Sequence, residues 1–337
     1  MKRVVASITF GLANSAFVLL VLSIIIFAFI RAVPGDPVVS MFGAEGISDA
    51  QLAELRTELG LDKPVVVQYM AWATRALHGD LGQSLADKQP VFSMVVSRLR
   101  PTIELALAAI ITSTFLGIAV GMMAAVNRGR LFDYLTMLGT LSGISLPIFW
   151  VGILLIVVFS VNFDLLPTGG LAGFDVEMRA LTGFPLLDSV LTGNGKAFRD
   201  IAEHMVLPVA TLAIAPTALI ARTARASILE VLHEEYVTAG LARGLSFRGV
   251  LIRHVLRNAM IPIITIIGLE MGLYLGGSIV TETVFSWPGL GRYLMEAVLA
   301  HDYPVIQGAI LIYAVIIITV NFLVDLSYRL IDPRMRA

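Results

Sequence analysis

Six apolar stretches, each roughly 17 to 28 residues long and almost free of charged side chains, follow one another along this chain, and a helix needs about 20 apolar residues to cross the hydrocarbon core of a bilayer. Across the chain 57% of the residues are hydrophobic and 15% are charged, against about 25% charged in a typical soluble domain. The sequence therefore predicts an all-α polytopic membrane protein with six transmembrane helices. The predicted spans are 9–30, 101–126, 134–161, 205–225, 259–281 and 306–328.

Lysine and arginine gather in four places that six spans would put on one side of the membrane. Short loops rich in these residues stay in the cytoplasm, so we expect both termini to be cytoplasmic, in a bacterial inner membrane. The first apolar stretch is longer than the roughly 7–15 apolar residues of a signal peptide and is predicted to be an uncleaved membrane helix. The basic residues concerned are Lys2, Arg3, Arg128, Arg130, Arg222, Arg225, Arg243, Arg248, Arg253, Arg257, Arg329, Arg334 and Arg336.

The segments between the spans differ in character. Two helices are expected before residue 100, at 48–60 and 64–77, and they form either an extracytoplasmic cap or a pair of helices at the membrane interface. The glycine-rich segment 162–204 is expected to be a loop with one short helix. The chain is thus divided into an N-terminal transmembrane helix 1–30, an extracytoplasmic helical segment 31–100, a five-helix core 101–328 with a cytoplasmic loop 226–258, and a cytoplasmic tail 329–337.

The chain lacks the residue patterns of hydrolysis, metal binding and nucleic-acid binding. Its net charge is −1, it has no cysteine, and its five histidines lie far apart in the sequence. None of its four lysines, Lys2, Lys63, Lys88 and Lys196, follows a glycine-rich loop of the kind that holds phosphates. We therefore expect no catalytic residue, no metal and no nucleic-acid partner. If such a chain moves a solute uphill, a partner must hydrolyse the ATP.

The basic segment between the fourth and fifth spans, from Arg222 to Met260, predicts a docking surface. Its first half has a helical pattern, and Ala239 and Gly240 give it a small patch that another protein can approach closely. Gly244 breaks this helix, and a short amphipathic helix follows, with apolar residues on one side and arginines on the other. Two helices joined at a glycine form a rigid knob. The alternative is a basic loop that only satisfies the positive-inside rule.

Short motifs of a known family recur in order over nearly the whole chain. They are Pro34-Gly-Asp-Pro37, Glu58-Leu-Gly-Leu-Asp-Lys-Pro64, His78-Gly-Asp-Leu-Gly82, Leu146-Pro-Ile-Phe-Trp150, Phe285-Ser-Trp-Pro-Gly-Leu-Gly291, Asp302-Tyr-Pro304 and Asp332-Pro-Arg334. Together with the knob they resemble the permeases of ATP-binding-cassette (ABC) importers of the dipeptide, oligopeptide and nickel subfamily. The likeness is greatest to the first permease subunit of bacterial dipeptide transporters, and it implies the type I ABC importer permease fold.

In that subfamily the loop between the fourth and fifth spans carries a coupling helix that sits in a groove of an ATPase subunit. The resemblance implies a second homologous permease, two ATPase subunits that bind ATP and Mg, a solute-binding protein, a peptide substrate and the lipid membrane as partners. The chain itself would then not be an enzyme. We expect coupling to the ATPases at Glu235, Tyr236, Ala239, Gly240, Arg243, Gly244, Leu245, Ser246, His254 and Asn258.

A single carboxylate, Glu270, lies in the middle of the fifth predicted span, where an ionised group is costly. It is about 200° around the helix from Gly268, which belongs to a series of glycines at a spacing that favours close helix packing. We hypothesise that Glu270 lines the translocation path and meets a peptide amine. The alternative is a protonated or ion-paired structural residue. The glycine series are Gly268, Gly272 and Gly276, Gly117 and Gly121, and Gly139 and Gly143.

Hydroxyl groups near two prolines are further candidates for the translocation path. Ser142 and Ser145 precede Pro147 in the third span, and Thr211 precedes Pro216 in the fourth. A proline frees backbone carbonyls, which gives either a flexible gate beside the pore or a packed kink.

Three other functions compete with peptide import. The first is the same machine with nickel, glutathione or an opine-like solute as cargo. The second is an ion-coupled transporter that works alone, for which Glu270 is the one coupling carboxylate near the midplane. The third is a membrane enzyme or sensor, for which no catalytic constellation is present in the sequence.

Overall fold

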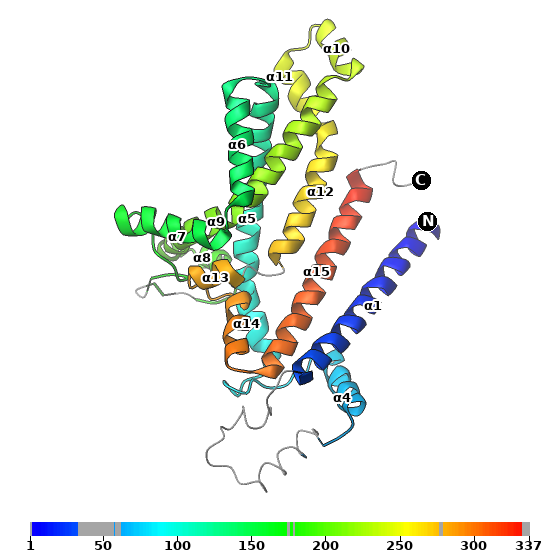
Figure 1. The fold of residues 1–337 in the computed structure, drawn as a ribbon, viewed down its shortest axis with the longest axis vertical. Coiled ribbons are helices and arrows are strands. Elements are labelled where there is room, and N and C mark those ends of the chain that lie inside the picture. Colours follow the sequence, from blue (N-terminus) through cyan, green and yellow to red (C-terminus); the bar gives the residue numbers. More distant parts are fainter. Residues whose placement is uncertain are drawn as a thin grey trace. The chain divides into compact units, whose positions relative to one another are not determined.

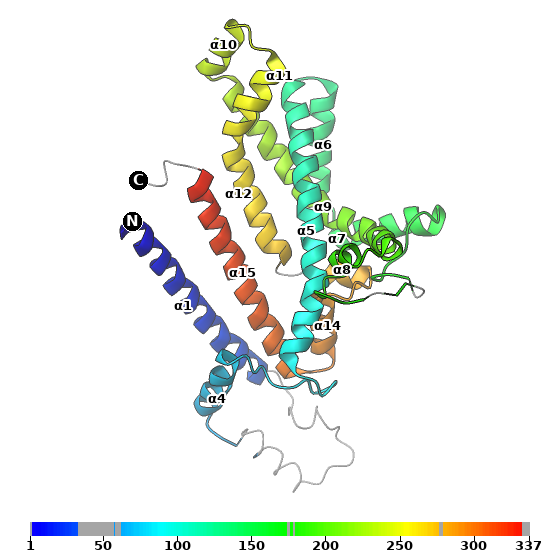
Figure 2. The same cartoon turned by 180° about the vertical axis from the view of Figure 1, so that it is seen from behind.

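The computed structural model describes residues 2–32, 57, 62–173, 176–177, 179–275 and 279–331. The described residues form helices joined by turns, with one isolated antiparallel bridge between Gln83 and Pro90 (Figures 1 and 2). The elements are α1 (Lys2–Ala32), α4 (Val65–Leu77), α5 (Val91–Val126), α6 (Leu131–Ser145), α7 (Ile148–Leu155), η1 (Ile156–Asn162), α8 (Pro185–Leu191), α9 (Gly195–Leu232), α10 (Glu235–Ala242), α11 (Phe247–Val250), η2 (Leu251–Val255), α12 (Leu256–Leu275), α13 (Ile279–Val284), α14 (Leu290–Leu299) and α15 (Tyr303–Ile331).

The chain forms two compact units. The first unit contains residues 1–102 and 288–319, and the second contains 103–287 and 320–337. The expected helix at 64–77 is confirmed as α4, whereas the one at 48–60 lies, apart from Thr57, outside the described residues. The membrane topology assigned to the segments 1–30, 31–100, 101–328 and 329–337 stays a prediction.

Four helices among the described residues are long and apolar enough to cross a membrane, and a bent pair of helices makes up to five. Helix α1 adds a shorter apolar stretch, Ala13–Phe29. The all-α membrane class is therefore confirmed, while the count of six spans stays a prediction. The four helices are Val91–Val126, Gly195–Leu232, Phe247–Tyr274 and Tyr303–Leu323.

The third apolar stretch is not the single helix 134–161 that the sequence predicted. Helix α6 ends at Ser145, and α7 with η1 continues at an angle of 106°. Leu146 and Pro147 both adopt extended conformations, with ψ of 133° and 129°. Proline has no N–H to donate, and it disfavours the helical conformation of the residue before it. Pro147, which was expected to interrupt this stretch, therefore separates it into two helical segments.

Two further helices extend beyond the predicted spans. Helix α5 begins at Val91 rather than 101, so Pro101 lies inside it, and α9 runs from Gly195 to Leu232 rather than over 205–225. Helix α9 also accommodates Pro208 and Pro216. Neighbouring helices satisfy the backbone groups that a proline frees in a membrane protein, so a proline is a weak sign of a helix end here.

The segment 162–204, predicted as a loop with one short helix, contains the short helix α8 and, beyond the prediction, the first turns of α9. Asn194 begins α9 by accepting a hydrogen bond from the Ala197 amide at 3.1 Å. Asp188 on α8 accepts hydrogen bonds from the Thr182 hydroxyl and from the amides of 181–183. Burial acts to raise the pKa of Asp188, but these hydrogen bonds outweigh it and hold the pKa below its ordinary value. The segment is thus ordered by polar contacts rather than by an apolar pattern.

The core of the first unit joins the ends of α5, α14 and α15. Val91, Val95, Leu290 and Val305 are fully buried there. Asp302, also buried, accepts hydrogen bonds from the Ser84 hydroxyl at 2.6 Å and from two amides of the following turn. Asp302 of one sequence motif therefore contacts the turn that directly follows another motif, 78–82.

The second unit is built around α9, which packs against α6, α7, α8 and α12. Helix α5 approaches α9 through Gly121, where an added Cβ would lie 2.5 Å from the Ala221 carbonyl oxygen. Trp287 and Phe285 are fully buried in this unit. The Gly170 amide donates to the Phe285 carbonyl at 2.8 Å, which ties the segment after η1 to the end of α13.

Candidate coupling site

Helix α10 is a short helix set off by a break at each end. The sequence predicted one helical segment from Ala226 to Gly244, but α9 ends at Leu232 and Glu234 is extended, with ψ of 142°. The break at Gly244 is confirmed: its φ is +87°, which glycine adopts without the strain that a side chain would cause. The chain then enters α11, whose first turn is capped by the Ser246 hydroxyl accepting from the Gly249 amide at 3.2 Å.

The inner face of α10 fixes it to the helices around it. Val237 is buried in one cluster with Val250, Val255 and Ala259 of the following helices, and Ile228 of α9 belongs to the same cluster. The hydrophobic cluster therefore joins the end of α9, α10 and the start of α12. A displacement of α10 must strain or move the helices on both sides of it.

A hydrogen bond adds to this contact. Asn258 donates from Nδ2 to the Tyr236 hydroxyl at 2.6 Å, across 22 positions of sequence. Both residues belong to the predicted coupling set. Gly240 of the same set faces the turn, where an added Cβ would meet Leu245 at 3.6 Å. The structure thus brings these four predicted residues together around the knob.

The outer face of α10 is exposed to solvent. At 100° per residue, Glu235, Ala239 and Ala242 lie on the side opposite Val237, and all three are exposed. Leu245 and Phe247 are exposed beside them in the turn and in α11. The crest formed by the first three residues consists of two alanines beside one glutamate and is flanked by exposed apolar side chains, a combination that often marks a protein-binding surface.

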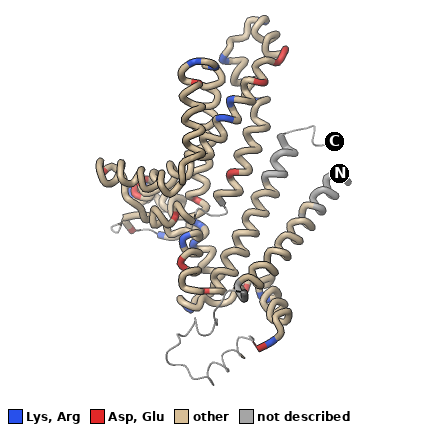
Figure 3. Tube along the Cα trace, in the orientation of Figure 1, with Lys and Arg blue, Asp and Glu red and all other residues tan. Residues whose placement is uncertain are grey.

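The remaining predicted residues lie around this crest. Arg243 follows the end of α10 and is exposed, and His254 is exposed in η2. Two basic residues, Arg128 and Arg130, also lie at the neighbouring turn between α5 and α6 (Figure 3). The ten predicted residues therefore lie on a single structural feature, and their role in coupling stays a prediction.

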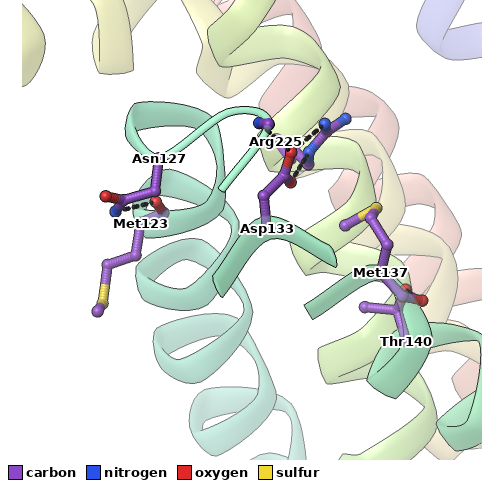
Figure 4. A network of polar contacts seen from close by, with 7 residues as sticks. Met123, Asn127, Asp133, Met137, Thr140 and Arg225 are labelled. Atoms are coloured by element: carbon purple, nitrogen blue, oxygen red, sulfur yellow. Dashed lines mark hydrogen bonds and ion pairs between the residues drawn. The ribbon is translucent and has the colours of Figure 1, made fainter. Parts of the chain in front are cut away.

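An ion pair that the sequence analysis missed holds the base of this region (Figure 4). Arg225 near the end of α9 donates from Nη2 to Asp133 of α6 at 2.8 Å and also donates from Nε to the same carboxylate. The Gly129 amide donates to Asp133 at 3.0 Å. Asp133 is 4% exposed, so its charge is compensated by these donors. The contact ties the turn between α5 and α6 to the helix that leads into α10.

We expect Asp133→Asn to lower the free energy of unfolding by about 2 kcal/mol, because it leaves the partly buried Arg225 without its anion. The measurement is the unfolding midpoint of the full chain in detergent. The variants Asp133→Asn, Arg225→Gln and the combination of both form a double-mutant cycle. The exposed pair Arg199 and Glu203, at 2.8 Å, provides the control, and Glu203→Gln should leave the midpoint unchanged. Additive effects of the two changes at Asp133 and Arg225 would contradict the pairing.

The predicted translocation residues do not form one cluster. Ser142 and Ser145 are exposed near the end of α6, and Ser145 donates to the Leu141 carbonyl at 2.8 Å. Thr211 is buried and donates to the Leu207 carbonyl at 2.9 Å. Its hydroxyl is therefore satisfied within α9. The assignment of these residues to a solute path stays a hypothesis.

Glu270 is half-buried in α12, and among the described residues its carboxylate has no hydrogen-bond or ion-pair partner. The glycine face of α12 is packed, since a Cβ on Gly272 would lie 3.1 Å from the Asn321 side chain of α15. Gly276 lies outside the described residues. The role proposed for Glu270 stays a hypothesis.

A groove between α5, α6 and α9 was not foreseen. Its volume is about 420 Å³, and it is lined by small and apolar residues with four threonines. Threonines scattered on apolar helices carry no distinctive sequence signal, which is why the prediction missed them. They are Thr112, Thr136, Thr140 and Thr217. No group of three metal-binding side chains occurs among the described residues.

Comparison with known proteins gives a consistent result. The family described as "Binding-protein-dependent transport system inner membrane component" matches residues 117–337, and its N-terminal companion family matches 6–106. The chain therefore belongs to the family of inner-membrane components of binding-protein-dependent transport systems. Members of this kind are permease subunits of ABC transporters, which are not themselves enzymes.

Three relatives are similar over almost their full length. The dipeptide transport system permease protein DppB of Escherichia coli (strain K12) is 46% identical over 318 residues, 94% of both chains. The di/tripeptide transport system permease protein DppB of Pseudomonas aeruginosa (strain UCBPP-PA14) is 42% identical over 93% of this chain and 94% of its own. The glutathione transport system permease protein GsiC of Escherichia coli (strain K12) is 40% identical over 94% of both.

A solved structure shares the fold. A chain of the MetNI methionine ABC transporter, in an inward-facing form, matches with a TM-score of 0.52 and 15% identity, over 71% of this chain and 96% of that one. The predicted type I ABC importer permease fold and the predicted subfamily are therefore confirmed. The family and its apolar helices also make the chain a multi-pass membrane protein.

Proposed function

We propose that this chain is the permease subunit of an ABC importer and forms half of the translocation pathway for dipeptides or short oligopeptides. The observation that carries the proposal is the 46% identity to a dipeptide permease over 94% of both chains. This identity and coverage support a common fold over almost the whole of both chains.

The proposal gives the α10 knob its role. The exposed crest of Glu235, Ala239 and Ala242 docks in a groove of an ATPase subunit, which binds the ATP and Mg. The buried contacts of Val237 pass the movement of the ATPase to α9 and α12. A second permease completes the pathway, and a solute-binding protein delivers the peptide from the opposite side. Both termini of this chain are cytoplasmic in this arrangement.

Glutathione is the second candidate cargo, because a glutathione permease is 40% identical over 94% of both chains. Both cargoes are small peptides with free termini, so the same pathway can carry either. An ion-coupled transporter that works alone is disfavoured by the family to which the chain belongs.

Reconstitution of the complete transporter in proteoliposomes tests the proposal. Labelled dipeptide should enter only when the solute-binding protein is outside and ATP is supplied to the ATPases. Glutathione and nickel are offered in parallel, and each competes with the dipeptide only if it shares the pathway. Uptake by this chain alone under an ion gradient, or ATP-driven uptake of nickel in place of peptides, would contradict the proposal.

A further inference from the structure

Helix α4 is anchored to the last turns of α1 by one of its faces. The Tyr69 hydroxyl lies 2.9 Å from the Ser23 hydroxyl, and the Tyr69 and Trp72 rings lie 5.3 and 5.7 Å from the ring of Phe27. Trp72 is buried. Because Phe27 belongs to the apolar stretch Ala13–Phe29, α4 is held against the end of this apolar stretch.

A second face of α4 is apolar and uncovered. Val66, Met70 and Leu77 are 68%, 60% and 87% exposed. At 100° per residue these three side chains fall within about 40° of one another, next to the anchored face. A continuous stripe of this kind, rather than scattered apolar residues, marks a surface that another apolar medium covers.

The third face of α4 carries both polar and apolar side chains and borders a cavity of about 680 Å³. Gln68 and Arg75 of α4 line it, together with Lys63 before the helix and Lys88 from the turn after it, and Asp80 is the acidic residue among the described lining residues. The basic side chains therefore lie away from the apolar stripe. A helix with one apolar face and one basic face is typical of elements that lie at a membrane surface.

We propose that α4 lies in the membrane–water interface, with Val66, Met70 and Leu77 among the acyl chains and Lys63 and Arg75 at the level of the lipid headgroups. Apolar side chains are also exposed on α1 near this contact, since Ile25 and Phe29 are 55% and 69% exposed on the side of α1 opposite Phe27. A lipid occupant also explains the basic residues, because headgroup phosphates pair with lysine and arginine. Of the two alternatives that the sequence left open for this segment, an extracytoplasmic cap or helices at the membrane interface, the proposal takes the second.

The absence of cysteine from the natural chain allows a direct test. Val66→Cys and Met70→Cys each receive an environment-sensitive fluorophore, and Ala71→Cys serves as the matched control on the exposed cavity side of the same helix. The full chain is placed in nanodiscs of phosphatidylethanolamine and phosphatidylglycerol. Emission is then quenched either by nitroxide-labelled lipids or by iodide in the water.

Labels at 66 and 70 should emit at shorter wavelength, respond to the nitroxide lipids, and be quenched by iodide several-fold less than the label at 71. Equal iodide quenching at all three positions, or no response to nitroxide lipids at 66 and 70, would overturn the proposal. Shielding of 66 and 70 that arises only after a solute-binding protein is added would overturn it as well, because the stripe would then be a protein-docking surface.

Discussion

Gly121→Val is expected to prevent the second unit from folding and to abolish transport. An added Cβ at this position would lie 2.5 Å from the Ala221 carbonyl oxygen and 2.8 Å from the Ala224 Cβ, whereas carbon atoms pack favourably at about 3.5–4.0 Å. Helices α5 and α9 would have to separate along their whole contact. Overpacking costs about 1–3 kcal/mol even where neighbours can adjust, and a backbone carbonyl cannot rotate away as a side chain does.

The measurement is the yield of monodisperse chain in detergent, followed by uptake in proteoliposomes. Gly139→Ala is the matched control, because nothing lies within 4 Å of an added Cβ there. That variant should fold normally and gain up to about 1 kcal/mol, since alanine favours a helix over glycine. A monodisperse Gly121→Val chain with an unchanged unfolding midpoint would show that α5 and α9 are not closely packed.

The glycine spacing illustrates how far the sequence could be interpreted. A glycine at every fourth position predicts close helix packing but not the partner helix. The sequence favoured the series in the fifth span, and the structure confirms contact at Gly272, with Asn321. It shows a tighter contact at Gly121, against a backbone carbonyl. The spacing of glycines along the sequence shows that another helix can pack closely at that point. Which helix packs there is decided by the tertiary contacts.

Helix existence was predictable where one local rule dominated. The sequence pattern after Pro64 predicted the helix α4, and Pro147 predicted the interruption that follows α6. The rule failed where membrane helices satisfy each other's backbone groups: α5 continues through Pro101 and α9 through Pro208. The start of α9 was hidden for another reason, because the segment before it is ordered by hydrogen bonds to Asp188 rather than by an apolar period.

Polar contacts between distant residues lay beyond the sequence. Asp133 and Arg225 are 92 positions apart, and Ser84 and Asp302 are 218 apart. Each of these residues is ordinary in its local context, since aspartate begins helices and arginine lies near membrane boundaries. The knob at α10 was predictable because its features are local: a helix, a glycine with positive φ, and a second helix.

Ala239→Trp is expected to uncouple the permease from its ATPases while leaving it folded. Ala239 is exposed on the crest of α10, opposite the buried Val237, so this chain has room for the indole. The proposed groove of the ATPase, which would receive an alanine at this position, does not have room for the indole. We expect ATPase binding to weaken at least about tenfold, which corresponds to about 1.4 kcal/mol. The measurement is retention of the ATPase subunits during purification, together with ATP-driven uptake.

The control at the same position is Ala239→Ser, which keeps the crest small and should retain both ATPase binding and uptake. The unfolding midpoint separates this prediction from the one at Gly121, because a change on an exposed crest should not alter the midpoint, whereas a change in the contact of α5 with α9 should. If Ala239→Trp keeps full uptake, the crest does not enter a groove and docking must use another surface. If it lowers the midpoint as well, the crest is held by contacts within this chain, and the loss of uptake would report folding rather than coupling.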